Sequence, residues 1–544
     1  MPDDFRPSTP ETQDDVREIP DDFEGISESS ESAEGGTRPE ILVEPGRLPE
    51  LATAGEAVLI AAGAEVFQRG GVLVRPASFA VRASGARETV AVGLRQVTAP
   101  ALIDRLARAA VWQRPTKKDG PRTIDPPGQI ATIILSRAGE WRFPSLAGVA
   151  MAPTLRRDGT LLTAPGYDPE SRMFLALPPG FRMPPIPDDP TKADAKAALG
   201  ELDALLSGFP FVTDIDRSVA LSMLMTPVLR PAMDAAPFHF AVAPTPGSGK
   251  SFLIDLASAI ATGQICPVSN VSRNPEELEK NLTGLLLDGF PVISLDNVEN
   301  EVGGSLLCQA TERPMIRLRP IGTSQIATIE NVTTIFGTGN NAVVTGDMVR
   351  RALPCHLDAG VERPELRHFD SNPLAMALDN RGVYVSAILR IARAYRCAGS
   401  PNLPRPVASY GDWNALVRGP LIWLGCPDPA DAMESARADD PQLATLATFL
   451  AAFALLPQAS EGVPAKAIIT AAEERIATIH GEPAELAWPE LAEALEPIAT
   501  VKGRLDGRRL GYFLRANAGR VLNGRKLVVR SGHESTSIWG VRPA

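Results

Sequence analysis

The chain is poor in cysteine and histidine, with five of each among its 544 residues. No two cysteines have the C-x-x-C spacing of a zinc or redox motif, and the histidines do not cluster. This scatter argues against a cysteine-based zinc site or a disulfide framework, and it is typical of reduced thiols in a cytoplasm. The cysteines are Cys266, Cys308, Cys355, Cys397 and Cys426.

Long apolar runs are missing as well. The longest, Leu443–Leu456, is too short to span a bilayer and contains Thr445 and Thr448. The first residues, MPDDFRPSTPETQDD, are acidic and lack the apolar core of a signal peptide. We therefore expect a cytoplasmic protein that does not enter a membrane.

The chain has a net charge of −11, and its charged residues are unevenly distributed along the sequence. Residues 1–50 carry fifteen acidic residues and four arginines, whereas residues 501–544 carry ten basic residues and two acidic ones. An acidic, Ser/Glu/Pro-rich segment cannot bury enough apolar surface to fold, so residues 1–45 are predicted to be a disordered tail. The basic end is the first place to expect nucleic acid, and a solvated basic surface is the alternative.

A chain of this length is expected to contain several domains. Strand-like and helix-like patterns mix between the tail and a Pro/Asp-rich linker, so residues 46–190 are predicted to form an α+β domain. Within it, Gly70-Gly71 predicts a hairpin turn, and residues 128–136 fit either a strand or a short buried helix. No paired carboxylates or metal-ligand cluster in this region indicate catalysis.

The stretch APTPGSGKS (243–251) ends like a phosphate-binding loop, although Pro244 replaces the first glycine of the usual pattern. An apolar strand precedes it and a helix follows it, which is the context that the motif requires. Loop N–H groups would bind phosphate oxygens, Lys250 would reach the β- and γ-phosphates, and the Ser251 hydroxyl would bind Mg²⁺. The residues predicted to hold ATP are Thr245, Pro246, Gly247, Ser248, Gly249, Lys250, Ser251 and Phe252.

A partner carboxylate for this loop is predicted at Asp296. The run GFPVISLDN (289–297) fits a fully buried strand ending in Asp296, 46 positions after Lys250. That spacing leaves room for one crossover helix, predicted at NPEELEKNLTGLLL. Asp296 would hold Mg²⁺ through water or through Ser251, and the two motifs together predict nucleotide binding.

A third strand, NVTTIFGTGN (331–340), is predicted to end at Asn340, and Arg350 and Arg351 follow ten residues later. An amide at a strand tip can orient an attacking water. An arginine beyond it can stabilise γ-phosphate charge, usually across a subunit boundary. The alternative is a turn asparagine with two surface arginines, but the order and spacing favour function.

PTPGSGKS, VISLDN, FGTGN and GDMVRR, in this order, resemble the Walker A, Walker B, sensor 1 and arginine-finger elements of AAA+ ATPases. More narrowly, the likeness is to the helicase-like ATPases that bacterial prophages, plasmids and integrated elements encode with primases, related to superfamily three helicases. It covers roughly residues 130–430. It implies a hexameric ring that uses ATP and Mg²⁺ on single-stranded or forked DNA during replication of a mobile element, with a primase or another replication protein as a partner.

The resemblance also implies a domain order and site roles. An AAA+ core (191–400), with a parallel sheet flanked by helices, would precede a helical lid (401–485). Lys250 and Ser251 would contact phosphate and magnesium, and Asp296 would contact the metal. The remaining matches are Asn340 as sensor 1, Arg350 and Arg351 as trans-acting fingers, and Arg418, in LVRGPL, as a sensor 2 contact.

One departure bears on hydrolysis. The glutamate that usually follows the Walker B aspartate is Asn297 here, and an amide cannot accept a proton. Either Glu299 or Glu301 is then the base, or hydrolysis is slow and switch-like.

Two further segments are candidates for DNA contact. Residues 315–331 fit a hairpin which, in superfamily three helicases, projects into the ring channel; Arg317 and Arg319 would contact phosphates there. An ordinary surface hairpin explains this pattern equally well. Residues 486–544 fit a winged helix with a two-residue turn at Asn523-Gly524, and protein docking is its alternative role. Its expected DNA contacts are Arg508, Arg509, Arg515, Arg525 and Lys526.

Three functions follow from these patterns. The first is an ATP-driven DNA helicase or translocase. The second is a nucleotide switch that acts as a replication initiator or helicase loader with slow hydrolysis, which Asn297 favours. The third, a protein remodeller that acts without DNA, is disfavoured by the basic end.

Overall fold

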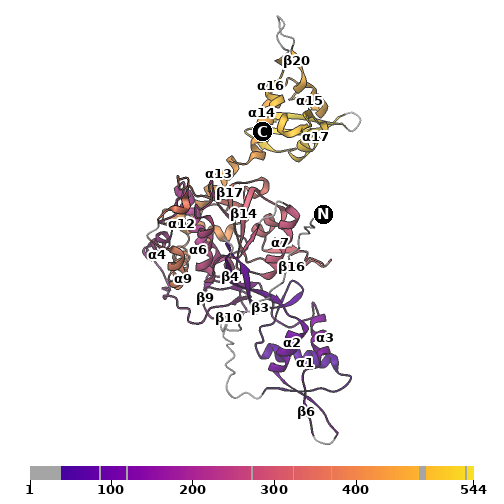
Figure 1. Cartoon of the computed structure of the whole chain (residues 1–544), viewed down its shortest axis with the longest axis vertical. Helices are drawn as coiled ribbons and strands as arrows, with labels where there is room; N and C mark the ends of the chain where they lie inside the picture. The colour runs from indigo at the N-terminus through magenta and orange to yellow at the C-terminus, as the bar shows by residue number, and fades with distance from the viewer. Residues whose placement is uncertain are drawn as a thin grey trace, which may run out of the picture.

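The computed structural model describes most of the chain beyond the acidic head. The described ranges are 38–84, 87–117, 120–270, 274–322, 324–368, 371–476, 485–532 and 536–544. The predicted disordered tail therefore lies outside the described residues up to position 37. Figure 1 shows three parts along the long axis: helices α1 to α3 at one end, a large middle part, and helices α14 to α17 at the other end. Within these ranges, no helix is both long and apolar enough to cross a membrane.

The N-terminal part packs three helices against a small sheet. Its core joins apolar side chains from Ile41 to Phe143, including the buried Trp112. Residues 128–136 are helical, which settles the two alternatives for that segment. The elements are β1 (Glu40–Leu42), α1 (Leu48–Ala61), α2 (Ala99–Ala109), β5 (Val111–Arg114), β6 (Arg122–Thr123) and α3 (Gly128–Ser136).

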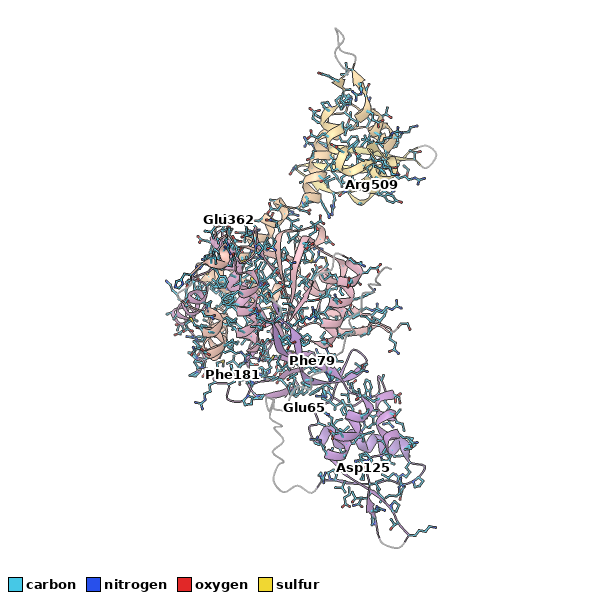
Figure 2. The ribbon with its side chains drawn as sticks, viewed as in Figure 1. Glu65, Phe79, Asp125, Phe181, Glu362 and Arg509 are labelled. Atoms are coloured by element: carbon cyan, nitrogen blue, oxygen red, sulfur yellow. The ribbon has the colours of Figure 1, made fainter. Side chains whose placement is uncertain are left out.

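A three-stranded antiparallel ribbon connects this part to the middle of the molecule. The predicted hairpin at Gly70-Gly71 is confirmed, because Phe67–Arg69 (β2) pairs with Val72–Arg82 (β3) across that turn. β3 also pairs with Glu88–Gln96 (β4). Phe79 of β3 meets Phe290 edge to face at 5.5 Å between ring centroids, and Figure 2 shows Phe79 where the two parts join. Part of the predicted 46–190 domain therefore packs on the middle core.

A five-stranded parallel sheet forms the centre of the middle part, in the order β13-β14-β17-β12-β18. All six residues of β12 are buried, as expected for a strand covered on both faces. The mixed α/β core with a parallel sheet flanked by helices, which the family resemblance implies, is therefore present. Its strands are β12 (Phe238–Ala243), β13 (Val268–Asn270), β14 (Val292–Val302), β17 (Thr334–Val344) and β18 (Ala352–His356).

Helices lie in two apolar cores beside this sheet (Figure 1). One core contains the buried faces of α4 (Lys192–Leu205), α5 (Asp214–Leu229), α6 (Lys250–Thr262) and α10 (Arg381–Cys397). The other contains those of α7 (Pro275–Asp288) and α8 (Ser305–Glu312). Tyr410 and Trp413, from the predicted lid, belong to the first core.

The central strands are longer than the sequence predicts. β14 continues past Asp296 to Val302, and β17 continues past Asn340 to Val344. The register shifts between Leu295 and Val298, where a bulge accommodates the polar residues that were expected to end the strand. The prediction that these strands stop at their polar residues is therefore wrong, since a bulge lets pairing resume beyond them.

The C-terminal part has one core, which runs from Leu446 to Val541. The predicted two-residue turn at Asn523-Gly524 is confirmed, because Leu522 pairs with Arg525. The helix at 441–453, expected in the lid, packs into this core, so the expected boundary at 486 falls inside a packed unit. The elements are α14 (Pro441–Phe453), α15 (Ala465–Glu473), α16 (Pro489–Ala499), α17 (Gly507–Ala516), β24 (Val521–Leu522), β25 (Arg525–Ser531) and β26 (Ser537–Pro543).

This packing predicts where the C-terminal unit can be cut. A fragment of residues 439–544 should unfold cooperatively on heating, whereas residues 486–544 should not. The shorter fragment lacks Leu446, Phe449 and Phe453, which are buried in the core. Each large apolar side chain contributes about 2–5 kcal/mol, and together these exceed the margin of a small domain. Thermal melts followed by circular dichroism check this, and a cooperative melt of the shorter fragment would contradict it.

Candidate functional site

The loop between β12 and α6 depends on two glycines in left-handed conformations. Gly247 has φ +77° and Gly249 has φ +97°, a region that favours glycine. A Cβ on Gly247 would also come within 3.2 Å of the backbone nitrogen of Glu365. The two glycines therefore let the loop turn tightly, although Pro244 stands at its start.

Lys250 begins α6 and turns back into this loop. Its Nζ donates to the Thr245 carbonyl at 3.1 Å, and the Ser248 hydroxyl donates to the same oxygen at 2.7 Å. The residue is only 8% exposed. Burial lowers the pKa of Lys250, and the negative charge of Asp296 opposes that shift. An ammonium group is thus enclosed at the N-terminal end of a helix, where anions are favoured.

The carboxylate of Asp296 joins three elements of the core. It accepts a hydrogen bond from Thr338 on β17 at 2.6 Å and one from Ser251 on α6 at 3.4 Å. The Thr338 hydroxyl also accepts the backbone N–H of Asn297 at 2.9 Å. The predicted neighbours Ser251 and Asp296 therefore lie together. Thr338 was missed, although its place two residues before Asn340 puts both side chains on the same face of a strand.

Asn340 lies across from the bulge in β14. Its Nδ2 donates to the Asn297 side chain at 3.5 Å, and its backbone is in register with Glu299. Its Oδ1 is buried and accepts no hydrogen bond from the described residues. The next residue, Asn341, donates to the Pro244 carbonyl at 3.4 Å, which ties this strand to the start of the phosphate loop. β17 is therefore tied to the loop at Asn341, and Glu299 of β14 lies opposite Asn340.

The structure separates the two predicted finger arginines. The Arg351 side chain is 5% exposed, and its Nε donates to Glu312 Oε2 at 2.9 Å. The Arg350 side chain is 54% exposed, and its Nη1 lies 3.7 Å from Glu312 Oε1. Although burial favours the neutral acid, hydrogen bonds from Arg351 hold the pKa of Glu312 below its usual value. Only Arg350 is placed at the surface, where a neighbouring subunit could be reached.

Arg418 is bound within its own segment. It ends a π-helical turn (Asn414–Arg418) and is buried. Its Nε donates to Asp428 at 2.8 Å, and its Nη1 donates to the Arg405 carbonyl at 2.7 Å. These contacts connect parts of the segment 405–428. The Arg418 guanidinium, which was expected to contact nucleotide, is bound by Asp428 and by the Arg405 carbonyl instead.

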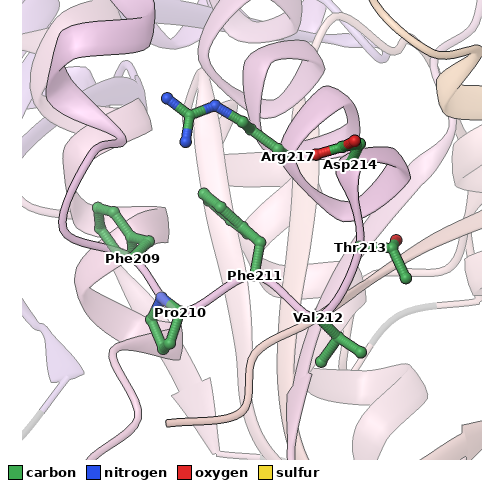
Figure 3. A pocket seen from close by; sticks show the side chains of 7 residues that line it. All are labelled: Phe209, Pro210, Phe211, Val212, Thr213, Asp214 and Arg217. Atoms are coloured by element: carbon green, nitrogen blue, oxygen red, sulfur yellow. The ribbon is translucent and has the colours of Figure 1, made fainter.

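A pocket that the sequence did not indicate lies beside the phosphate loop (Figure 3). It is an open hollow of about 370 Å³ lined by Phe209, Pro210, Phe211, Val212, Thr213, Asp214 and Arg217. Phe209 is 3.6 Å from the position of a Cβ on Gly249, and its ring centroid is 6.0 Å from that of Phe252. The only available signal was the aromatic stretch GFPFV before α5. The pocket therefore joins an aromatic wall to the start of α6.

The predicted hairpin at 315–331 is present as Met315–Leu318 (β15) paired with Ala327–Glu330 (β16). Ile316, Leu318 and Ile329 are buried in the second core, whereas Arg317 and Arg319 are exposed. The tip at Thr323 lies outside the described residues. Buried and exposed residues alternate along β15, so one face of the hairpin packs on the core and the two arginines lie at the surface.

The predicted basic residues of the C-terminal part are all exposed. Arg508, Arg509 and Arg515 lie on α17, which buries Leu510 and Leu514, and Figure 2 shows Arg509 in this part. Arg525 and Lys526 begin β25. Tyr512, which sequence reasoning missed, is 69% exposed on α17, and the Arg515 guanidinium lies 4.9 Å from its ring centroid.

An ion pair fixes the segment that lines the pocket. His356 Nδ1 lies 3.1 Å from Asp216 Oδ1, and the Thr213 hydroxyl donates to the other Asp216 oxygen at 2.6 Å. The hydrogen bond with Asp216 raises the pKa of His356 above 6.5. Burial opposes ionisation of Asp216, but hydrogen bonds from His356 and Thr213 hold its pKa below 3.8. Both groups are therefore charged at mildly acidic pH.

This pair predicts a pH-dependent stability. The contribution of His356 is complete below pH 6.5 and is lost as the pH rises through its raised folded pKa. His356→Gln should therefore lower the free energy of unfolding more at pH 5.5 than at pH 8.5. Because the imidazole is partly exposed, the difference should be about 0.5–1 kcal/mol. Urea unfolding at the two pH values measures it, and an equal loss at both would contradict the assignment.

Comparisons with known proteins give only distant structural matches. No family model matches the chain, and no curated protein matches it. Similar solved structures include the apo C-terminal region of NrS-1, with 12% identity over 62% of this chain and 68% of that one, at a TM-score of 0.29. The JCV helicase is 13% identical over 47% of this chain and 63% of that chain, at a TM-score of 0.22. The same helicase with a bound small molecule is 12% identical over 48% of this chain and 72% of that chain, at a TM-score of 0.20. These TM-scores describe partial overlap, so the chemistry of the site rests on its own geometry.

Proposed function

We propose that the chain is an ATPase that binds ATP and Mg²⁺ at the phosphate loop and uses hydrolysis to move on or unwind DNA. One observation carries the ATPase assignment: the Asp296 carboxylate meets the Ser251 hydroxyl beside a glycine loop that encloses Lys250. These groups come from different elements, so a chance resemblance in nine residues does not explain them. Their chemistry is that of a triphosphate site.

The donor set suits magnesium and phosphate. Hydroxyl and carboxylate oxygens are the ligands that Mg²⁺ prefers, and Ser251 and Asp296 would supply them. The bound ion would neutralise charge on the β- and γ-phosphates. Lys250 would exchange the Thr245 carbonyl for phosphate oxygens, and loop N–H groups would supply the remaining donors. Thr338 would hold the Asp296 carboxylate in place through its 2.6 Å hydrogen bond.

Water activation falls to Asn340 and Glu299. Asn340 has a buried acceptor oxygen next to the loop, which suits it to orient a water. Glu299 is in register with Asn340, whereas Glu301 is in register with Val343. We therefore assign the general base to Glu299. The aromatic pocket at Phe209 would take the base of the nucleotide, since stacking surfaces favour planar rings.

Assembly and DNA binding complete the proposal. The exposed Arg350 would act across the boundary between subunits of a ring. The family resemblance implies that this ring is a hexamer. Arg317 and Arg319 would contact single-stranded or forked DNA in the channel, and Arg508 with its basic neighbours would contact it at the C-terminal winged-helix unit. A primase or another replication protein of a mobile element is the proposed partner.

A second function is a nucleotide switch that acts as an initiator or loader. The observation that favours it is Asn297, whose amide stands directly after Asp296 and cannot accept a proton. In that case binding would be retained and turnover would be slow. The rate of hydrolysis with and without DNA distinguishes the two functions.

The first test is turnover. The full chain should hydrolyse ATP, single-stranded DNA should stimulate it, and Lys250→Ala should abolish both binding and turnover, because the variant removes the only ammonium group in the loop. Lys196→Ala, an exposed lysine on α4, is the matched control and should behave as the wild type. Phosphate release measures turnover. ATP binding without DNA-stimulated release would favour the switch instead.

Substitution of Arg350 should affect turnover, whereas substitution of Arg351 should affect stability. Arg350→Ala should leave the melting temperature unchanged and lower turnover by about 1,000-fold or more, the lower end of the range for arginine fingers. Arg351→Ala should destabilise the fold by about 1–3 kcal/mol, because it leaves Glu312 without its main donor. Mixing Arg350→Ala with Lys250→Ala subunits should restore part of the turnover if Arg350 acts in trans. Mixed samples as inactive as either variant alone would contradict that role.

A further inference from the structure

The loop that carries Arg350 is held by two carboxylates from different parts of the chain. It runs from the 3₁₀ turn Gly346–Met348 to the start of β18. Glu312 binds it from the end of α8, and Asp440 binds it from the start of α14. Glu312 leads directly to the hairpin that carries Arg317 and Arg319, whereas Asp440 leads to α14, which packs on the basic helix α17.

Glu312 connects the loop to the β15–β16 hairpin. Its carboxylate accepts from Arg351 Nε at 2.9 Å and from the Ser409 hydroxyl at 3.1 Å, and it lies 3.7 Å from Arg350. It is the last residue of α8, and β15 begins three positions later at Met315. A displacement of the hairpin would therefore move the carboxylate that pins Arg351 and faces Arg350.

Asp440 connects the same loop to the C-terminal unit. It is 1% exposed and caps α14, with Oδ1 accepting from the Gln442 N–H at 2.9 Å. Its Oδ2 accepts from the Gly346 N–H at 3.3 Å. Helix α14 is packed on α17 through Phe449 and Phe513, whose ring centroids are 5.4 Å apart. A movement of α17 would therefore reach Gly346 through the Phe449–Phe513 contact, α14 and the Asp440 carboxylate.

We propose that Glu312 and Asp440 are positioning residues that make the placement of Arg350 depend on DNA contact at the hairpin and at α17. This coupling rests on the proposed function, because it requires an ATPase that binds DNA. DNA would favour one placement of both elements, and the two carboxylates would transmit that placement to the loop. A ligand can shift such an equilibrium only through contacts that differ between the two states, and these are the contacts that would differ.

Two conservative variants of the full chain test this coupling. Glu312→Gln keeps the length of the side chain but removes its charge. Asp440→Asn still caps α14, because asparagine caps as well as aspartate, but it turns an NH₂ group toward the Gly346 N–H. Glu201→Gln is the control, since it breaks a similar half-buried pair with Arg390, 2.6 Å long, between α4 and α10.

Turnover is measured against ATP concentration with and without oligo-dT. Both variants should keep the KM for ATP, while the ratio of kcat with DNA to kcat without DNA should fall by roughly fivefold or more, a typical size for coupling between sites. Glu201→Gln should keep the full stimulation. A purely structural role would instead lower kcat with and without DNA by the same factor, so that the ratio is unchanged.

The results of this experiment distinguish a failure of the coupling from a failure of the proposed function. If the wild type is stimulated and both variants keep that stimulation, the coupling is overturned and the ATPase stands. If the wild type turns over without response to DNA, the proposed function fails and the coupling fails with it. Should Glu312→Gln unfold, Asp440→Asn decides alone, because its helix cap is preserved.

Discussion

The carboxylate of Asp296 is the point on which the candidate site depends. It holds the hydroxyls of Ser251 and Thr338, which come from a helix and from a neighbouring strand. It also carries the charge that opposes the loss of the proton from the buried Lys250. A buried ammonium is costly unless an opposite charge or an anionic ligand compensates it. The loop and the strand therefore stabilise each other before any nucleotide arrives.

The order of the sheet makes this meeting possible. β12 leads into the phosphate loop, and β17 lies between β12 and β14. Because all five strands are parallel, the loop and the polar residues of β14 and β17 reach the same edge. The hydrogen bond from Asn341 to the Pro244 carbonyl closes this edge at the position where the motif lacks its glycine. A proline is tolerated there, since its carbonyl remains available.

Local patterns predicted the parts of the site, whereas contacts between distant segments could not be predicted. The loop glycines, Lys250 and the neighbouring strand with Asp296 follow from spacing and apolar runs, and the hairpin turns follow from paired glycines or Asn-Gly. The burial of Arg351 could not be predicted, because it depends on Glu312, 39 positions away. The packing of α14 with the C-terminal unit was missed for the same reason, since an apolar helix does not reveal its partner.

The departure at Asn297 has a structural cause that bears on the chemistry. This residue has φ +55°, in the left-handed region that asparagine tolerates and that costs most other residues about 1–2 kcal/mol. A glutamate at this position would be strained by the bulge that lets β14 continue to Val302. The same bulge brings Glu299 into register with Asn340. The asparagine at 297 therefore suits the backbone conformation of the bulge, and the proposed general base, Glu299, lies two residues further along the strand.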